Sequence, residues 1–323
     1  MLKNKNTVIN IIALCGVFFL IAFPKEMVFA AQTGLLSWFN NVVPSLFPFM
    51  VIVNIIISSK GRLSVPSFIY VPFKKFFLVP EAGITAYLFG TLSGYPLGAK
   101  IAADLYRSNA ISKDDIQRLL LFCCNAGPMF IMGALSCGIL NNVKAGYIIL
   151  ISSIISNALT GALFGRILFN FLRPFQNSII TCSQYKTSAS PVQTSCEAII
   201  RVGGYIILFS IISAIMEICG ITSAAAELLS LFIPAEYADI KAILSGMLEM
   251  TCGINALSNS PSSIIIKSVV SAFIVSFGGL SVIMQSADFL RGTGIDFRLF
   301  IIGKLINGII TAAITFAVML FIG

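Results

Sequence analysis

Two short clusters of helix-breaking residues interrupt an otherwise apolar chain. The first reads LSGYPLGAK over residues 92–100, and the second reads FCCNAGP over residues 122–128. In hydrocarbon, each backbone N–H or C=O without a partner costs several kcal/mol. A broken helix therefore persists at membrane depth only where protein buries it or where it lines a polar cavity. We expect the two clusters to mark a path for a polar solute.

The composition places this chain in a membrane. Hydrophobic residues make up 57% and charged residues 11% of its 323 residues, and the mean hydropathy is +0.96. A soluble domain carries about 25% charged residues. The formal charge of +8 comes from Lys and Arg in short connections, which fits orientation in the lipid bilayer better than a nucleic-acid partner. Histidine is absent and the eight cysteines show no CxxC spacing, so we expect no enzyme, no catalytic residue, no metal site and no cofactor.

Seven apolar segments are each close to the ~20 residues that a transmembrane helix needs. They cover residues 8–23, 34–58, 116–140, 146–171, 198–219, 264–290 and 299–322. The first resembles a signal peptide, and we interpret it as an uncleaved, signal-anchor-like span. Two less continuous stretches, residues 82–105 and 240–259, are interpreted as re-entrant helical hairpins. Seven spans that begin in the cytoplasm put most loop Lys and Arg residues inside and the C-terminus outside, in accord with the positive-inside bias.

The order span, broken hairpin, broken span, span occurs twice along the chain. Gly127 and Gly279, like Asn157 and Asn307, recur about 150 residues apart. The predicted fold class is therefore an all-α polytopic membrane protein with an inverted-topology repeat, two re-entrant hairpins and broken transmembrane helices. Transporters of this kind bind substrate near the midplane, between discontinuous helices. The predicted divisions are a first span over 1–33, a first repeat over 34–173, a cytoplasmic linker over 174–196 and a second repeat over 197–323.

The first repeat offers candidate contacts for an anion. In the hairpin, breaks at Gly94 and Gly98 leave free amides beside Ser93 and Tyr95. Lys100 follows, and it either faces a ligand or extends to the cytoplasmic headgroups. In the broken span, Pro128 suits the first turn of a half-helix, whose unpaired amides hold a carboxylate or phosphate. The candidates there are Asn125, Gly127 and Pro128; the alternative is a proline kink satisfied by a neighbouring helix.

The second repeat carries a carboxylate where the first has Ser93. Glu249 is the strongest ionisable candidate, as a proton carrier, a cation ligand or a partner of Lys100. The other candidate substrate contacts in this repeat are Thr251, Gly253, Asn255, Gly279 and Ser281.

The two clusters carry a resemblance to a known family. SGYPLGAK over 93–100 and NAGPMFIMG over 125–133 resemble the sporulation integral membrane protein YlbJ family, within the wider group with nucleoside-recognition, or Gate, domains. The resemblance covers most of the chain from Gly34 onward. It implies two Gate-like repeats with an architecture similar to concentrative nucleoside transporters, and a role in spore formation, where YlbJ-like proteins move dipicolinic acid toward the forespore.

The leading hypothesis is a membrane transporter of a small anionic metabolite that works by alternating access. The family resemblance implies dipicolinate as substrate and the mother-cell-derived membrane around the forespore as location. One alternative is a cation-coupled transporter of nucleosides or other neutral solutes, and another is a membrane scaffold for spore assembly that transports nothing. The residues leave open whether H⁺ or Na⁺ couples transport and whether the chain forms a homo-oligomer.

Overall fold

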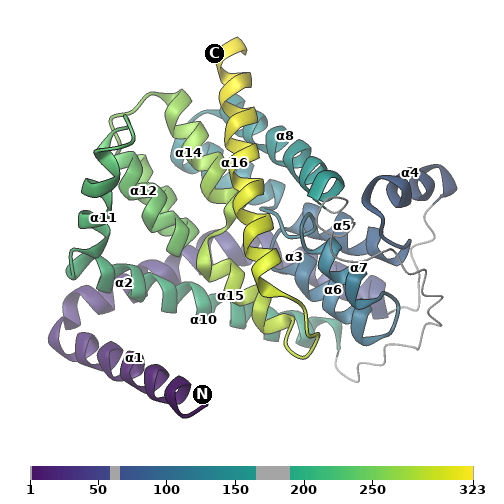
Figure 1. Cartoon of the computed structure of the whole chain (residues 1–323), viewed down its shortest axis with the longest axis horizontal. Coiled ribbons are helices and arrows are strands. Elements are labelled where there is room, and N and C mark those ends of the chain that lie inside the picture. Colours follow the sequence, from purple (N-terminus) through teal and green to yellow (C-terminus); the bar gives the residue numbers. More distant parts are fainter. Residues whose placement is uncertain (1, 59–65, 165–189, 323) are drawn as a thin grey trace.

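The computed structural model describes residues 2–58, 66–164 and 190–322, and every regular element in these ranges is helical (Figure 1). Up to residue 164 the helices are α1 (Leu2–Ala22), α2 (Pro24–Ser37), the π-helical turn η1 (Trp38–Val42), α3 (Val43–Ser58), α4 (Ser67–Phe77), α5 (Ala82–Ser93), α6 (Leu97–Arg107), α7 (Lys113–Leu119), the π-helix η2 (Phe130–Leu140), α8 (Val143–Leu159) and η3 (Thr160–Phe164). From residue 190 they are α10 (Pro191–Ile218), α11 (Ile221–Ser230), α12 (Tyr237–Leu248), α13 (Met250–Ser258), α14 (Ile264–Phe277), α15 (Gly279–Phe289) and α16 (Phe297–Ile322).

The chain is a polytopic helical protein of membrane type. Within the described residues, five helical stretches are long and apolar enough to cross a membrane: Pro24–Ile56, Val143–Leu163, Pro191–Ile218, Ile264–Phe289 and Phe297–Phe321. A sixth span results if the pair Tyr70–Phe77 and Ala82–Ser93, bent by 87°, counts as one. Seven spans, their orientation and the position of the two termini stay predictions.

Two boundaries differ from the predicted spans, and the break predicted within the third span is observed. The second predicted span begins at Pro24 instead of residue 34, because a proline in the first helical turn needs no hydrogen-bond partner for its nitrogen. The third predicted span is no continuous helix: α7 ends at Leu119 and a new helix begins only at Pro128. The predicted linker 174–196 lies largely outside the described residues, and its end is helical because Ser190 caps α10 by accepting a hydrogen bond from the Gln193 amide, 3.1 Å away.

Each half contains a pair of short helices followed by an interrupted helix. The first hairpin consists of α5 and α6, joined at Gly94 to Pro96, and the first break covers residues 120–127. The second hairpin consists of α12 and α13, joined by the single extended residue Glu249. The second break is Gly278, which adopts a left-handed conformation (φ 85°) and ends α14. Whether the hairpins are re-entrant and the halves are inverted repeats stays a prediction.

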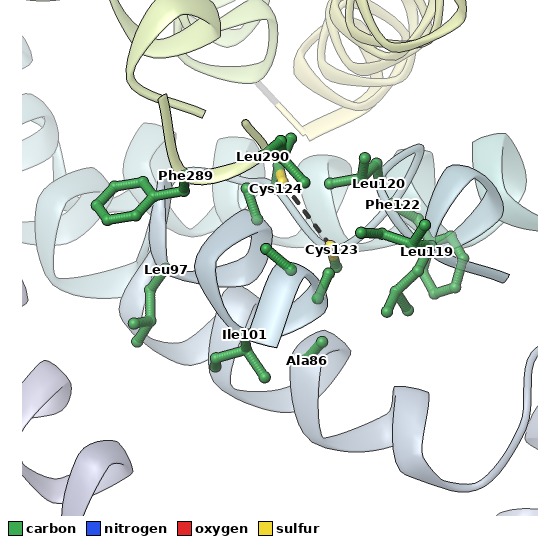
Figure 2. Close-up of a cluster of buried hydrophobic side chains, with 14 of the residues drawn as sticks. Ala86, Leu97, Ile101, Leu119, Leu120, Phe122, Cys123, Cys124, Phe289 and Leu290 are labelled. Atoms are coloured by element: carbon green, nitrogen blue, oxygen red, sulfur yellow. Dashed lines mark hydrogen bonds between the residues drawn. The ribbon is translucent and has the colours of Figure 1, made fainter. Parts of the chain in front are cut away.

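The two halves pack together through α16. This helix crosses the middle of the view between α8 and α14, whereas α1 extends from the periphery (Figure 1). Asn307 on α16 donates a hydrogen bond of 2.6 Å to Asn157 on α8, so the two predicted repeat equivalents touch each other in the core. Around the first break, Phe289 and Leu290 from the end of α15 join buried side chains of the first half (Figure 2).

Glycines let backbone segments approach closely at both hairpins. A Cβ atom added at Gly90 or Gly98 would lie 2.0 or 1.9 Å from the carbonyl oxygen of Cys123, so the first break inserts between the two arms of the first hairpin. In the second hairpin, a Cβ atom at Gly253 would lie 2.3 Å from the Cα atom of Gly246. Such distances leave no room for a side chain, and we infer that these glycines are required for packing.

We expect Gly98→Ala to lower the unfolding temperature of the purified protein. The added methyl group meets backbone, which moves less readily than a side chain, and overpacking of this kind costs about 1–3 kcal/mol. Gly204→Ala is the matched control, since it lies in α10 with nothing within 4 Å of an added Cβ atom. Thermal unfolding in detergent should show a loss for Gly98→Ala and no loss for Gly204→Ala. Equal unfolding temperatures would contradict the close packing.

Candidate functional site

The tip of the first hairpin lies directly against the first break. The Tyr95 amide donates a hydrogen bond of 2.6 Å to the carbonyl oxygen of Asn125. A Cβ atom at Gly94 would lie 2.7 Å from the Gly127 nitrogen, and one at Gly127 would lie 2.5 Å from the Ser93 carbonyl oxygen. Gly94 also has a φ of 99°, which disfavours any side chain. The helix that follows begins at Pro128, where the proline pattern predicts it.

The second half repeats this arrangement. A Cβ atom at Gly279 would lie 2.8 Å from the carbonyl oxygen of Gly246 and 3.2 Å from that of Leu248, so the second break packs on the end of α12. The two hairpin tips also meet each other. The Tyr95 hydroxyl contacts the sulfur of Met250 and lies 3.3 Å from the carbonyl oxygen of Val275. Both tips and both breaks therefore gather in one place, although they lie more than 150 residues apart in the sequence.

A small cavity of about 30 Å³ lies at this meeting point. Its walls come from η1, α3, the first hairpin tip and the first break in one half, and from α10, the second hairpin tip and α15 in the other. Five of the predicted site residues line it, namely Gly94, Tyr95, Gly127, Glu249 and Thr251. Two further polar residues, Ser45 and Gln285, complete its polar surface.

Glu249 contributes a buried carboxylate to the cavity wall. Its side chain is 1% exposed and caps α13, because Oε2 accepts a hydrogen bond of 2.9 Å from the Cys252 amide and another from the Thr251 hydroxyl. The other oxygen, Oε1, takes part in neither of these two hydrogen bonds. One carboxylate oxygen is thus structural, and the other is available to a ligand, a cation or a proton.

Ser281 contacts Gln285, a residue that lines the cavity. Its hydroxyl accepts a hydrogen bond of 3.0 Å from the Gln285 amide group, one helical turn away on α15. Ser281 itself is buried and Gln285 lines the cavity, so this bond fixes which end of the Gln285 amide faces the cavity.

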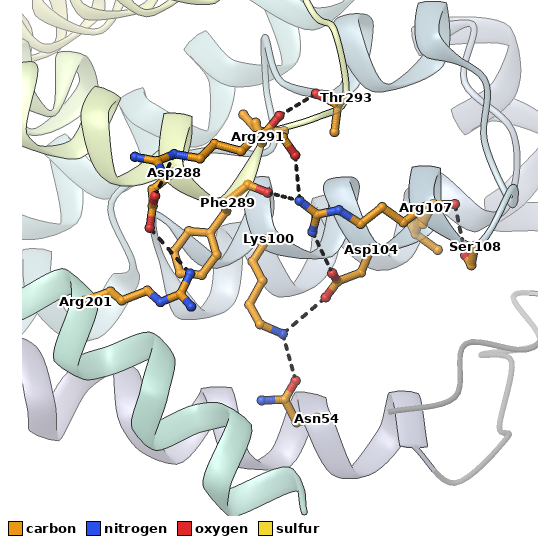
Figure 3. Close-up of polar contacts among 12 residues, drawn as sticks. Asn54, Lys100, Asp104, Arg107, Ser108, Arg201, Asp288, Phe289, Arg291 and Thr293 are labelled. Carbon is orange, nitrogen blue, oxygen red and sulfur yellow. Dashed lines mark hydrogen bonds and ion pairs between the residues drawn. The ribbon is translucent and has the colours of Figure 1, made fainter. Parts of the chain in front are cut away.

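Lys100 lies in another part of the structure. Its ammonium group is 3.2 Å from Asp104 Oδ2 and donates a hydrogen bond of 3.1 Å to Asn54 on α3 (Figure 3). The group is buried, so it does not extend to headgroups, and its partners are Asp104 and Asn54, not Glu249. In this conformation the Lys100 charge is neutralised locally.

The remaining predicted residues surround the cavity without lining it. Ser93 and Asn125 are buried, and the Ser93 hydroxyl and Asn125 Oδ1 make no hydrogen bond with any residue that the structure describes. Gly98, Gly253 and Gly279 provide the close backbone contacts described above. Pro128 is half-buried at the start of its helix, whereas Asn255 is exposed on α13.

Sequence reasoning missed one charged residue next to this site. Lys304 on α16 is 1% exposed and donates a hydrogen bond of 2.6 Å to the carbonyl oxygen of Cys124 in the first break. Its ammonium group also lies over the Tyr95 ring, 5.6 Å from the centroid. A lysine within an apolar span is a signal that could have found it, since ionisable residues at such depth are generally functional.

No cluster of metal-ligating side chains occurs in the described ranges. Residues 2–58, 66–164 and 190–322 contain no group of three or more Cys, Asp or Glu side chains placed to hold a metal ion. The polar atoms around the cavity are instead one carboxylate, hydroxyl groups and an amide group.

Comparison with known proteins identifies the family. The chain is 31% identical over 317 residues to the sporulation integral membrane protein YlbJ of Bacillus subtilis (strain 168), and the match covers 90% of this chain and 77% of that protein. No family model matches the chain, and no solved structure gives a significant match. The identity and its extent are sufficient to conclude that the chain belongs to the YlbJ family of sporulation integral membrane proteins.

Proposed function

We propose that this protein transports a small carboxylate anion, dipicolinate during sporulation, by alternating access between two inverted repeats. One observation carries the proposal: the cavity is built by the tips of two hairpins, one from either half, together with the first helix break and with α15, the helix that follows the second break. Non-helical backbone at membrane depth is tolerated where it lines a cavity, and transporters place their substrate sites at such breaks. The sporulation protein to which the chain is related supports the role in spore formation.

The size of the cavity defines the state that the structure represents. A cavity of about 30 Å³ accommodates one or two water molecules. Sites for small organic molecules are typically about 300–1,000 Å³ in size. In the proposed cycle this conformation is therefore the closed one, and dipicolinate enters only when the two halves separate on one side. The tip contact between Tyr95 and Met250 is the contact that must loosen.

Glu249 sets the charge requirement of the cycle. An anion cannot bind beside a second negative charge in a buried cavity without a compensating positive charge. A proton on Glu249 provides this compensation and makes its carboxyl group a hydrogen-bond donor to the substrate. The proposed transport is therefore coupled to protons, with Glu249 as the carrier.

A second candidate function is cation-coupled uptake of a neutral solute such as a nucleoside. The Glu249 carboxylate favours it, because a carboxylate oxygen that faces a cavity is also a ligand for a hard cation such as Na⁺. In that case the cation would neutralise Glu249 and the solute would need no positive partner.

Uptake into proteoliposomes tests both functions. We expect accumulation of dipicolinate that depends on an imposed pH gradient, and no accumulation of uridine under a Na⁺ gradient. Gly94→Leu and Pro128→Leu should abolish dipicolinate uptake, because the first inserts a side chain between the first hairpin tip and the first break. Gly204→Leu, with open space around it, should leave uptake unchanged.

The outcomes separate the hypotheses. Sodium-driven uridine uptake without dipicolinate uptake would replace the anion proposal by the second candidate. If the Gly94→Leu and Pro128→Leu variants both transport dipicolinate at the wild-type rate, the cavity does not lie on the transport path. No flux of either solute, with no ligand-dependent thermal stabilisation, would favour a scaffold.

A further inference from the structure

Lys304 is a buried positive charge without a negative partner in the part of the chain that the structure describes. Its side chain is 1% exposed, and no Asp or Glu oxygen in residues 2–58, 66–164 or 190–322 lies within 4.0 Å of Nζ. An ammonium group has three N–H donors. One of them binds the Cys124 carbonyl oxygen, and the ring of Tyr95 covers another side of the group.

This arrangement is costly unless an anion joins it in another state. Removing an ion from water carries a penalty of several kcal/mol, which a single carbonyl hydrogen bond does not offset. Lys304 also cannot reach the lipid headgroups in this rotamer, since its ammonium group is held inward by Cys124. The second buried lysine, Lys100, differs because Asp104 neutralises it at 3.2 Å.

The neighbours of Lys304 connect it to the cavity. Tyr95, whose ring lies under the ammonium group, lines the cavity, and Ala126 lines it two residues after Cys124. The Lys304 ammonium group therefore has to give up only the hydrogen bond to the Cys124 carbonyl oxygen to turn from the first break toward the cavity. The polar side chains that line this cavity include the carboxylate of Glu249 and the amide of Gln285.

We propose that Lys304 is the anion-binding charge of this cavity and that it exchanges the Cys124 carbonyl oxygen for a carboxylate of the substrate when the cavity opens. The inference rests on the proposed function and adds the residue that selects a carboxylate over a neutral solute. In the closed state the Cys124 carbonyl holds the charge in place. In the loaded state the carboxylate neutralises it.

Binding of dipicolinate to the purified full-length protein tests the inference. Titration calorimetry at fixed ionic strength should show affinity at least about tenfold lower for Lys304→Met and for Lys304→Gln, a change that matches loss of one charged contact. Lys304→Gln keeps a donor for the Cys124 carbonyl, so it removes the charge with the smallest change in packing. Lys100→Met is the matched control, because it removes a buried lysine that belongs to another cluster, and its affinity for dipicolinate should equal that of the wild type.

Thermal unfolding distinguishes a binding role from a structural one. Lys304→Gln removes the buried unpaired charge and keeps a donor for the Cys124 carbonyl oxygen, so it should unfold at the wild-type temperature or above it, whereas Lys304→Met leaves that carbonyl without its donor and should unfold at a lower temperature than Lys304→Gln. Wild-type affinity in both Lys304 variants would overturn the inference while leaving dipicolinate transport in place. If the wild-type protein neither binds nor transports dipicolinate, the proposed function itself is wrong.

Discussion

Glu249→Gln is expected to reduce dipicolinate uptake by at least about tenfold, equivalent to roughly 1.4 kcal/mol in the transport barrier, while the protein stays folded. The glutamine oxygen can still accept the hydrogen bond from the Cys252 amide, so the cap of α13 is retained. The amide group, however, does not titrate in the accessible pH range and cannot carry a proton through the cycle. Uptake driven by a pH gradient should therefore disappear, and the measurement is initial uptake of labelled dipicolinate in proteoliposomes.

Asp239→Asn is the matched control for this substitution. Asp239 is a second carboxylate that is 1% exposed, and it accepts hydrogen bonds from Ser260 and Ser262 at the base of α12, outside the cavity lining. Its amide variant should lose stability but retain uptake per folded molecule. If Glu249→Gln transports at the wild-type rate and only Glu249→Ala unfolds early, then Glu249 is a helix cap and not a proton carrier.

The hairpins and breaks were predictable because glycine and proline act locally. The cluster at 92–100 places Gly94 and Pro96 where no regular helix continues, and the structure ends α5 at Ser93. Pro128 likewise fixes the start of the helix after the first break. Such residues restrict backbone geometry irrespective of the tertiary environment, so the sequence alone locates these interruptions.

The second hairpin was less predictable, because its interruption depends on a side-chain cap and not on glycine or proline. Between α12 and α13 there is no glycine or proline at the turn, and the helix stops because the Glu249 side chain caps the next one. The cluster of glycines in the sequence also indicated ligand contacts, whereas Gly98, Gly253 and Gly279 provide room for backbone. A glycine pattern cannot distinguish close approach of a ligand from close approach of the chain itself.

Most partners of the two buried lysines, Lys100 and Lys304, could not be predicted from the sequence. Lys100 has Asp104 one helical turn away, a spacing that favours pairing, but the contribution of Asn54 comes from a helix 46 residues earlier. Lys304 meets Cys124 across 180 residues. The sequence prediction considered only Lys100, and the structure is needed to distinguish Lys100, which Asp104 neutralises, from Lys304, which has no acidic partner among the described residues.

Contacts at one end of the molecule hold the two halves together. Arg107, at the end of α6, donates hydrogen bonds of 2.7 and 3.0 Å to the carbonyl oxygens of Phe289 and Arg291, which lie at and just after the end of α15 in the other half (Figure 3). Gln117 on α7 exchanges two hydrogen bonds, of 2.9 and 2.7 Å, with the backbone of Asp296. These segments are predicted to face the cytoplasm, so in the proposed cycle their contacts close the inner side of the cavity.

Arg107→Met is therefore expected to shift the protein toward an inward-open state. Cys123 and Cys124 report this change, because both are free thiols, at most 1% exposed, in the first break (Figure 2). Loss of hydrogen bonds to a charged group, worth about 1.5–3 kcal/mol each, should raise the rate of their modification by N-ethylmaleimide at least about tenfold. Peptide-resolved mass spectrometry separates these two thiols from the other cysteines.

Arg201→Met is the matched control. It also removes an arginine charge, but the partner of Arg201, Asp288, lies in the same half, so thiol labelling should stay at the wild-type rate. Equal labelling in all three proteins would mean that the Arg107 contacts only stabilise the fold, and the closing element would then have to be the contact between the two hairpin tips.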